Sequence, residues 1–132
     1  MVKIRFAHES EKQPFVTEIP NSWMERPANG KEYPVISWAS AGGLSIITDS
    51  KQSFCCDDKH LSFIASRSPL YAHHVPPHEN DVEGTFQDQG WQSFRYQLRI
   101  GEKKPDLLST ESEKFMQPAC GIITSEHKEK PG

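Results

Sequence analysis

Potential metal ligands gather in one polar stretch of the chain: His73, His74, His78, Glu79, Asp81 and Glu83. Imidazole nitrogens and carboxylate oxygens are the ligands that zinc takes from proteins, together with thiolates. The stretch lacks the H-E-x-x-H helix motif of a zincin, and Pro76 and Pro77 favour an extended backbone. We therefore expect an exposed loop over His73–His78 that binds no structural metal. A metal-dependent binding module built on this loop is kept as an alternative functional hypothesis.

Aspartates are the other candidates for chemistry, and five lie between apolar runs: Asp49, Asp57, Asp58, Asp81 and Asp88. A glycosidase needs two carboxyl groups roughly 5 to 9.5 Å apart. All five fall in expected turns, where an aspartate side chain bonds to nearby backbone, so we interpret them as turn residues. The chain also has no G-x-S-x-G elbow and no P-loop. We expect no catalytic residue and no cofactor in this chain.

Cysteines and tryptophans complete the candidate set. Cys55 and Cys56 are adjacent, so in a strand their side chains point to opposite faces, which suits a buried strand better than a disulfide or a nucleophile. Three cysteines cannot all pair within the chain, which favours a reducing compartment, and we expect the cytoplasm. Trp38 is expected in the core, whereas Trp23 and Trp91 lie near turns and suit either the core or a platform for a sugar ring.

The elements that must position these residues are mainly strands. Alternating or continuous apolar runs predict strands at 2–7, 14–19, 35–38, 44–48, 54–56, 61–66 and 94–100, with a short one at 119–124. The 61–66 strand is expected to be half-buried, with Ile64 as one apolar mismatch. Polar segments predict turns at 9–13, 41–43, 49–53 and 57–59, a break at 20–22, and an irregular stretch at 23–33. The sequence predicts an all-β, mostly antiparallel β-sandwich.

One helix is expected near the C-terminus. Residues 105–116 begin with proline, which suits a first helical turn, and offer Leu107, Leu108 and Phe115 as apolar positions. Residues 68–90 form a long polar loop, and 126–132 a flexible tail.

Composition limits the classes of function. The 132 residues fit one domain, and 35% hydrophobic with 25% charged residues indicate a soluble protein. A net charge of -3 with scattered basic residues argues against a nucleic-acid partner. No apolar run approaches the roughly 18 residues of a membrane span, so we expect no membrane partner.

Several motifs follow one another along the chain: Ile19-Pro20 with Met24-Glu25-Arg26-Pro27, Glu32-Tyr33-Pro34 with Ser37-Trp38, Ile47-Thr48-Asp49-Ser50-Lys51, Arg67-Ser68-Pro69-Leu70-Tyr71-Ala72-His73-His74, Asp88-Gln89-Gly90 with Phe94-Arg95-Tyr96, Phe115 to Ala119, and Ser125 to Lys128. In this order they resemble the C-terminal β region of glycoside hydrolase family 38 α-mannosidases. The chain departs from the family pattern at Gln52-Ser53 and at Ile100-Gly101. The resemblance covers most of residues 14–128. It depends on the order and spacing of the motifs along the chain as much as on any single motif.

The resemblance implies a non-catalytic part of a retaining α-mannosidase, with a galactose-mutarotase-like sandwich. In that family the zinc ion and the aspartate nucleophile belong to an N-terminal barrel, which this chain does not match. The chain would brace the barrel, its partner, and the turn Asp49-Ser50-Lys51 would face the cleft that binds a mannose-containing glycan. The alternative is a free-standing carbohydrate-binding module using Trp23 or Trp91.

Two further expectations concern single segments. Arg26, close to two tryptophans, is expected to pair with a carboxylate or to cap carbonyl groups. The Met1–Phe6 strand and the Ala119–Thr124 segment are expected to present unpaired edges, through which the isolated and inactive chain forms a homo-oligomer.

Overall fold

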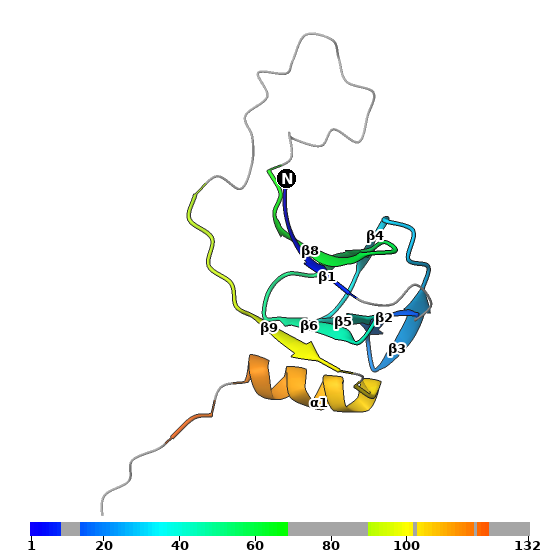
Figure 1. The fold of residues 1–132 in the computed structure, drawn as a ribbon. Coiled ribbons are helices and arrows are strands. Elements are labelled where there is room, and N and C mark those ends of the chain that lie inside the picture. The colour runs from blue at the N-terminus through cyan, green and yellow to red at the C-terminus, as the bar shows by residue number, and fades with distance from the viewer. Residues whose placement is uncertain (9–13, 69–89, 102, 118, 122–132) are drawn as a thin grey trace, which may run out of the picture.

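The computed structural model describes residues 1–8, 14–68, 90–101, 103–117 and 119–121. Within these described residues, nine strands form two antiparallel sheets that face each other, and one helix covers the outer face of the second sheet (Figure 1). Sheet A contains, in order, β1 (Val2–Ala7), β8 (His60–Ser66), β7 (Ser53–Cys56) and β4 (Glu32–Pro34). Sheet B contains β3 (Ser22–Arg26), β2 (Phe15–Ile19), β5 (Trp38–Ala41), β6 (Leu44–Thr48) and β9 (Tyr96–Ile100). The predicted all-β sandwich with one short helix is confirmed.

The core lies between the sheets and is formed mainly by alternate residues of strands in both sheets, together with Val35 from the segment between β4 and β5. Its buried members include Phe15, Val35, Ile46, Phe54, Cys56, Leu61 and Phe63. Phe63 stands at its centre, with the rings of Phe54, Phe94 and Tyr96 at centroid distances of 5.9, 5.9 and 5.5 Å. These separations are typical of packed aromatic pairs. The contacts of Phe63 with Phe94 and Tyr96 join β8 of sheet A to β9, the edge strand of sheet B, and to the segment that precedes it.

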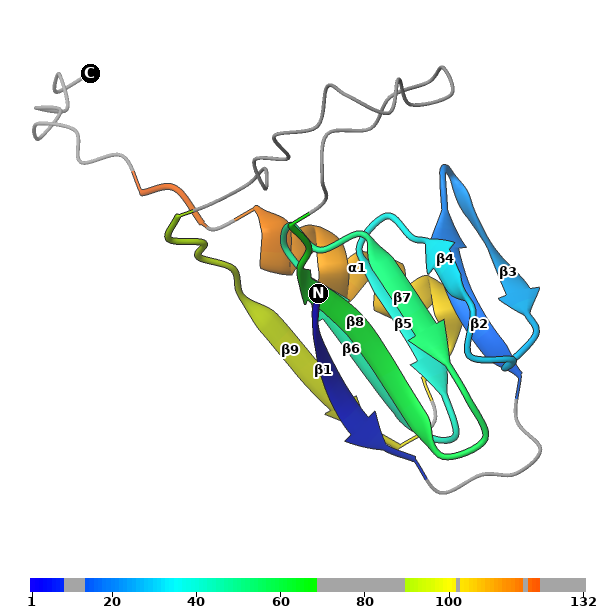
Figure 2. The same cartoon turned by 90° about the horizontal axis from the view of Figure 1, so that it is seen from above.

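The helix α1 (Pro105–Met116) lies across the outer face of sheet B (Figure 2) and makes a second, smaller core. Trp38, Ile47 and Leu108 are fully buried there, and Val16 and Phe115 pack against them. Trp38 Nε1 donates a hydrogen bond to Ser109 Oγ at 3.1 Å. The predicted helix range and the buried position of Trp38 are confirmed. Because α1 covers this face, β6 is buried on both faces, which explains its continuous apolar run.

Of the adjacent leucines offered as apolar positions of the helix, only Leu108 packs into the core. Leu108 is fully buried but Leu107 is 53% exposed, because neighbouring helical residues point about 100° apart and α1 meets the sheet along a single stripe.

The segment 23–33 was predicted to be irregular, but it contains most of β3 and the start of β4. The predicted break does end β2 at Ile19, but it is only two residues long: Pro20 and Asn21 form a turn, and Ser22 pairs with Ile19 as the start of β3. Asn21 has φ of 60°, a left-handed conformation that asparagine tolerates better than most residues. The turn therefore folds the chain back as a hairpin and creates β3.

The strand predicted at 35–38 is wrong over most of its length, since β4 ends at Pro34 and β5 starts at Trp38. The segment crosses from sheet A to sheet B. Val35 N donates to Gln52 O at 2.9 Å, whereas Ile36 N donates to Glu18 O at 3.3 Å and Ser37 O accepts from Thr48 N at 2.8 Å. Its backbone is therefore bonded to both sheets without joining either ladder.

Two other predictions need correction. The β8 strand is buried on both faces from Leu61 to Ala65, so Ile64 is not an exposed mismatch. Residues 119–121 form no strand, and the rest of the segment predicted at 119–124 lies outside the described residues. The predicted turn at 9–13, nearly all of the 68–90 loop and the 126–132 tail also lie outside them.

Candidate functional site

The Asp49-Ser50-Lys51 turn joins β6 to β7 and is fixed to the segment that leads into β9. Thr48 Oγ1 donates to Lys51 O at 2.6 Å and closes the turn. Asp49 accepts two hydrogen bonds from Arg95: Oδ1 from the backbone N at 3.0 Å and Oδ2 from Nε at 3.0 Å. Ser50 Oγ donates to the same Oδ1 at 2.9 Å. The turn is therefore held by its own side chains and has a defined shape.

Asp49 is ionised over a wide pH range. Partial burial raises its pKa, but the hydrogen bonds from Arg95 and Ser50, together with the charge of Arg95, outweigh burial and bring the pKa below the ordinary aspartate value. An aspartate held in this way is a poor proton donor, so its geometry suits positioning rather than acid catalysis.

Lys51 extends from the turn toward residues 92–94. Its Nζ donates to Gln92 Oε1 at 3.0 Å and lies 4.9 Å from the centroid of the Phe94 ring. The ammonium group stays exposed while the ring and the amide restrict its direction. The candidate residues predicted from the sequence therefore have different partners: Asp49 bonds to Arg95, and Lys51 bonds to Gln92.

A pocket of about 350 Å³, which we call the Lys51 pocket, opens beside this turn. Its walls include Ser50, Lys51, Ser66, Arg67 and Gln92. Hydroxyl, amide, ammonium and guanidinium groups therefore border one cavity, and all of these groups can donate hydrogen bonds to the oxygens of a polyhydroxylated ligand.

Arg67, on the wall of the pocket, is anchored through Glu32 of β4. Glu32 accepts from Arg67 Nη2 and lies 3.4 Å from Lys3 Nζ. Burial raises the pKa of Glu32, but the charge of Arg67 and the hydrogen bonds from Lys3 and Arg67 lower it overall. This cluster joins β1, β4 and the end of β8 at the pocket.

Sequence reasoning missed the residues that hold the turn and the pocket in place, namely Arg95, Gln92, Glu32 and Arg67. The one available signal was that Arg95 and Arg67 fall within motifs already recognised in the sequence. A motif does not state which acidic residue each arginine meets.

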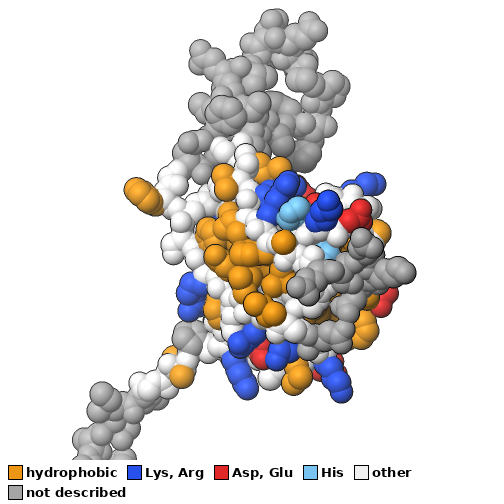
Figure 3. All heavy atoms as spheres, in the orientation of Figure 1, with side chains coloured by type: hydrophobic (Ala, Val, Ile, Leu, Met, Phe, Trp, Pro, Cys, Tyr) orange, Lys and Arg blue, Asp and Glu red, His pale blue; other side chains and the backbone are white. Residues whose placement is uncertain are grey.

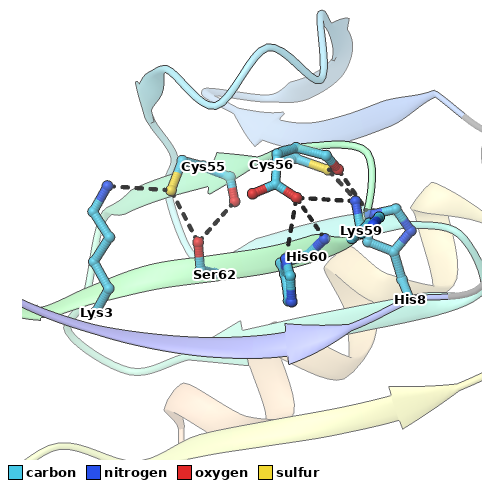
Figure 4. Close-up of polar contacts among 8 residues, drawn as sticks. Lys3, His8, Cys55, Cys56, Lys59, His60 and Ser62 are labelled. Atoms are coloured by element: carbon cyan, nitrogen blue, oxygen red, sulfur yellow. Dashed lines mark hydrogen bonds and ion pairs between the residues drawn. The ribbon is translucent and has the colours of Figure 1, made fainter.

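The two strand cysteines lie in different surroundings, as predicted from their adjacency (Figure 4). Cys56 belongs to the core between the sheets, and its Sγ lies 3.6 Å from His8 Nε2. Cys55 Sγ lies instead 2.9 Å from Ser62 Oγ and 3.6 Å from Lys3 Nζ. Burial, reinforced by the charge of Asp57, raises the pKa of the Cys56 thiol to about 12, so Cys56 is protonated at neutral pH. Neither Cys55 nor Cys56 forms a disulfide in the described part of the chain.

Asp57 behaves as a turn residue, in agreement with the sequence interpretation. Its Oδ1 accepts from Lys59 N at 2.9 Å and from His60 N at 2.8 Å. These backbone hydrogen bonds are the main cause of its lowered pKa. The adjacent Asp58 is exposed, whereas Asp81 and Asp88 lie outside the described residues.

The three tryptophans occupy three environments. Trp38 is buried under α1, Trp23 on β3 is 43% exposed, and Trp91 is fully exposed. Arg26 was expected to meet a carboxylate or carbonyl groups, but within the described part of the chain its guanidinium lies over the Tyr33 ring, 5.2 Å from the centroid, and its Nε has no hydrogen-bond partner. The hairpin places Arg26 beside β4, where an aromatic side chain faces it.

Metal ligands do not converge in the described part of the chain, where no group of three histidine, cysteine, aspartate or glutamate side chains is arranged around a common point. The His73–His78 loop lies outside these residues. Among the helices described, none is both long and apolar enough to cross a membrane.

No protein-family model, curated protein or solved structure matches the chain.

Proposed function

We propose that this chain is a non-catalytic β-sandwich portion of a retaining α-mannosidase, which braces the catalytic barrel and contributes a loop to the substrate cleft in carbohydrate metabolism. In such an enzyme, zinc and the nucleophile act on residues of the barrel. The proposal includes a cytoplasmic location and a mannose-containing glycan as the ligand of the parent enzyme.

One observation carries the proposal: residues from the separate motifs meet in pairs. Asp49 of the second motif bonds to Arg95, which comes from the last part of the third. Glu32 of the first motif pairs with Arg67 of the third. Contacts of this kind are expected if the motifs describe one structural unit, because charges spaced at random along a chain seldom meet with hydrogen-bonding geometry.

The Lys51 pocket supports the role at the cleft. It collects donors from the second and third motifs, Ser50, Lys51 and Arg67, at one end of the sandwich. Sugar recognition relies on several polar groups placed around a concave surface. A loop with this composition suits contact with substrate hydroxyl groups, while the chemistry takes place on another domain.

The open side of the sandwich supports the bracing role. Leu98 and Ile100 on β9 pair with the core residues Ile46 and Leu44, so they face the space between the sheets. They nevertheless remain 37% and 88% exposed. Hydrophobic side chains gather on this side of the molecule, between β1 and β9 (Figure 3). A surface of this kind favours contact with a neighbouring domain.

Sequencing the coding region that adjoins the first codon tests the identity of the parent. The proposal expects a barrel with a His-x-Asp zinc motif and an aspartate nucleophile. An adjoining region that encodes no such barrel would overturn it. The isolated chain should not hydrolyse an aryl α-mannoside with or without zinc, and zinc-dependent hydrolysis would contradict the assignment to a non-catalytic portion.

Lys51→Ala in the parent enzyme tests the role at the cleft. Removing the ammonium group should lower kcat/KM by about tenfold, the effect of losing one charged hydrogen bond to a ligand, with little change in Tm. Lys59→Ala is the matched control, since Lys59 is an exposed lysine in the β7–β8 turn at the other end of β7. Unchanged kinetics for Lys51→Ala would remove the turn from the cleft.

A second candidate is a free-standing carbohydrate-binding module, and the exposure of Trp23 and Trp91 favours it. Methyl α-mannoside titrated into the isolated chain distinguishes the two. Saturable binding that is lost in Trp23→Ala or Trp91→Ala would favour the module, whereas the bracing portion should bind no free mannoside.

A further inference from the structure

A groove of about 570 Å³ lies between the β2–β3 turn and α1, on the helix side of sheet B. We call it the Trp23 groove. Trp23 and Ile36 lie along one side, Met116 lies on the helix, and all three remain more than a third exposed. The groove shares no lining residue with the Lys51 pocket. It is within the size range of sites that bind ligands.

The charged groups that line the Trp23 groove are all acidic. Glu18 of β2 and Asp106 and Glu113 of α1 line it, and no lysine, arginine or histidine does. Elsewhere in the described part of the chain, Glu32, Asp49 and Glu111 each pair with an arginine and Asp57 with His60. The exposed Glu25 and Asp58 form no ion pair there. Within the described part of the chain, Glu18, Asp106 and Glu113 form no ion pair. Three carboxylates therefore share one groove without a compensating charge.

Glu113 lies at a position on α1 where a negative charge does not stabilise the helix. Asp106, Ser109, Glu113 and Met116 follow helical spacing, so one face of α1 presents them together. Asp106 lies in the first turn, where the helix dipole favours a negative charge. Glu113 lies near the C-terminal end, where the dipole disfavours it, and it has no lysine or arginine partner in the described chain. A charge that weakens its own helix is expected where it contributes to binding.

We infer that the Trp23 groove binds a basic peptide segment that carries arginine. A guanidinium group stacks on an exposed indole and donates several hydrogen bonds to carboxylates, and its methylene stem covers apolar side chains. The groove supplies each of these surfaces: the ring of Trp23, the carboxylates of Asp106 and Glu113, and the side chains of Ile36 and Met116. A neutral sugar would use the ring but leave the three negative charges without compensation.

Calorimetric titration of the complete 132-residue chain with a capped tetra-arginine peptide tests the inference. We expect saturable binding with Kd below about 1 mM, weakened by added salt because the contacts are ionic. Trp23→Ala should weaken binding about fivefold, the size expected for an exposed cation–π contact. The double variant Asp106→Asn, Glu113→Gln should weaken it further and reduce the salt dependence.

Two control variants, each changed outside the groove, test whether the peptide binds at the Trp23 groove. Trp91→Ala removes a tryptophan that does not line the groove, and Asp58→Asn removes an exposed charge in the β7–β8 turn. Both should bind the peptide as the unaltered chain does, and unchanged Tm values for the groove variants confirm that they fold. Absence of binding, binding insensitive to the groove variants, or binding of methyl α-mannoside instead of the peptide would each overturn the inference. None of these outcomes depends on the identity of the parent enzyme.

Discussion

Asp49 and Arg95 lie 46 residues apart and are joined by two hydrogen bonds, one from the arginine backbone and one from its side chain. The same guanidinium lies over the Phe115 ring, 5.1 Å from the centroid. Arg95 thereby connects the β6–β7 turn to the last turn of α1. Arg95, which directly precedes β9, therefore holds the turn beside the Lys51 pocket and also contacts the helix.

Asp49→Asn should make the free energy of unfolding less dependent on pH in the acidic range. The folded-state pKa of Asp49 is lowered, so its ionised form stabilises the fold above the unfolded-state value of about 3.9. That contribution is lost as the pH falls through the lower, folded-state pKa. At pH 7 the variant should be less stable by about 1 kcal/mol, a value limited by the exposure of Arg95. The difference should shrink as the pH falls below the unfolded-state value and through the lower, folded-state pKa. Urea unfolding at several pH values measures it, and Asp58→Asn is the control.

Leu108→Ala and Leu107→Ala should differ strongly although the residues are adjacent. Leu108 is fully buried against Trp38 and Ile47, so its truncation should cost roughly 2–5 kcal/mol. Leu107 is mostly exposed, and its truncation should change stability by less than about 0.5 kcal/mol. Equal effects in thermal unfolding would contradict the placement of α1 on sheet B.

The isolated chain should self-associate through the side of the sandwich where β1 and β9 are the outer strands. Ile100→Lys places a charge among exposed apolar residues of β9, which disfavours edge pairing. We expect it to weaken dimerisation at least about tenfold in sedimentation equilibrium. Leu107→Lys, an equivalent change on α1, should leave dimerisation unaltered. A purely monomeric chain at high concentration would refute edge association.

Zinc should not stabilise the chain. The spacing of His73, His74 and His78 beside two prolines led us to expect no structural metal there. Saturating zinc should therefore leave Tm within about 1 °C, and His74→Ala, His78→Ala should behave as the unaltered chain does. A large zinc-dependent rise in Tm that the double variant abolishes would establish a metal site in this segment.

The sequence by itself determined most of the strands and the helix. Period-two alternation predicted β9, the apolar run predicted β6, and a proline at the first helical position marked the start of α1. These features are local, because backbone geometry alone decides which neighbours share a face. The same alternation correctly predicted that Cys55 and Cys56 point to opposite faces of their strand. It could not choose between Leu107 and Leu108, because that choice depends on where a helix meets a sheet.

Only the tertiary structure decided how the candidate residues meet. The sequence marked Asp49, Ser50 and Lys51 as a polar turn, but their partners Arg95 and Gln92 come from the other end of the long 68–90 segment. Strand order brings β9 beside β6, and register then places Thr48 opposite Tyr96. The Trp23 groove arises in the same way, since the turn at Pro20–Asn21 folds β3 back and α1 crosses below it. Long-range pairing is set by the summed packing of both sheets, which no local pattern encodes.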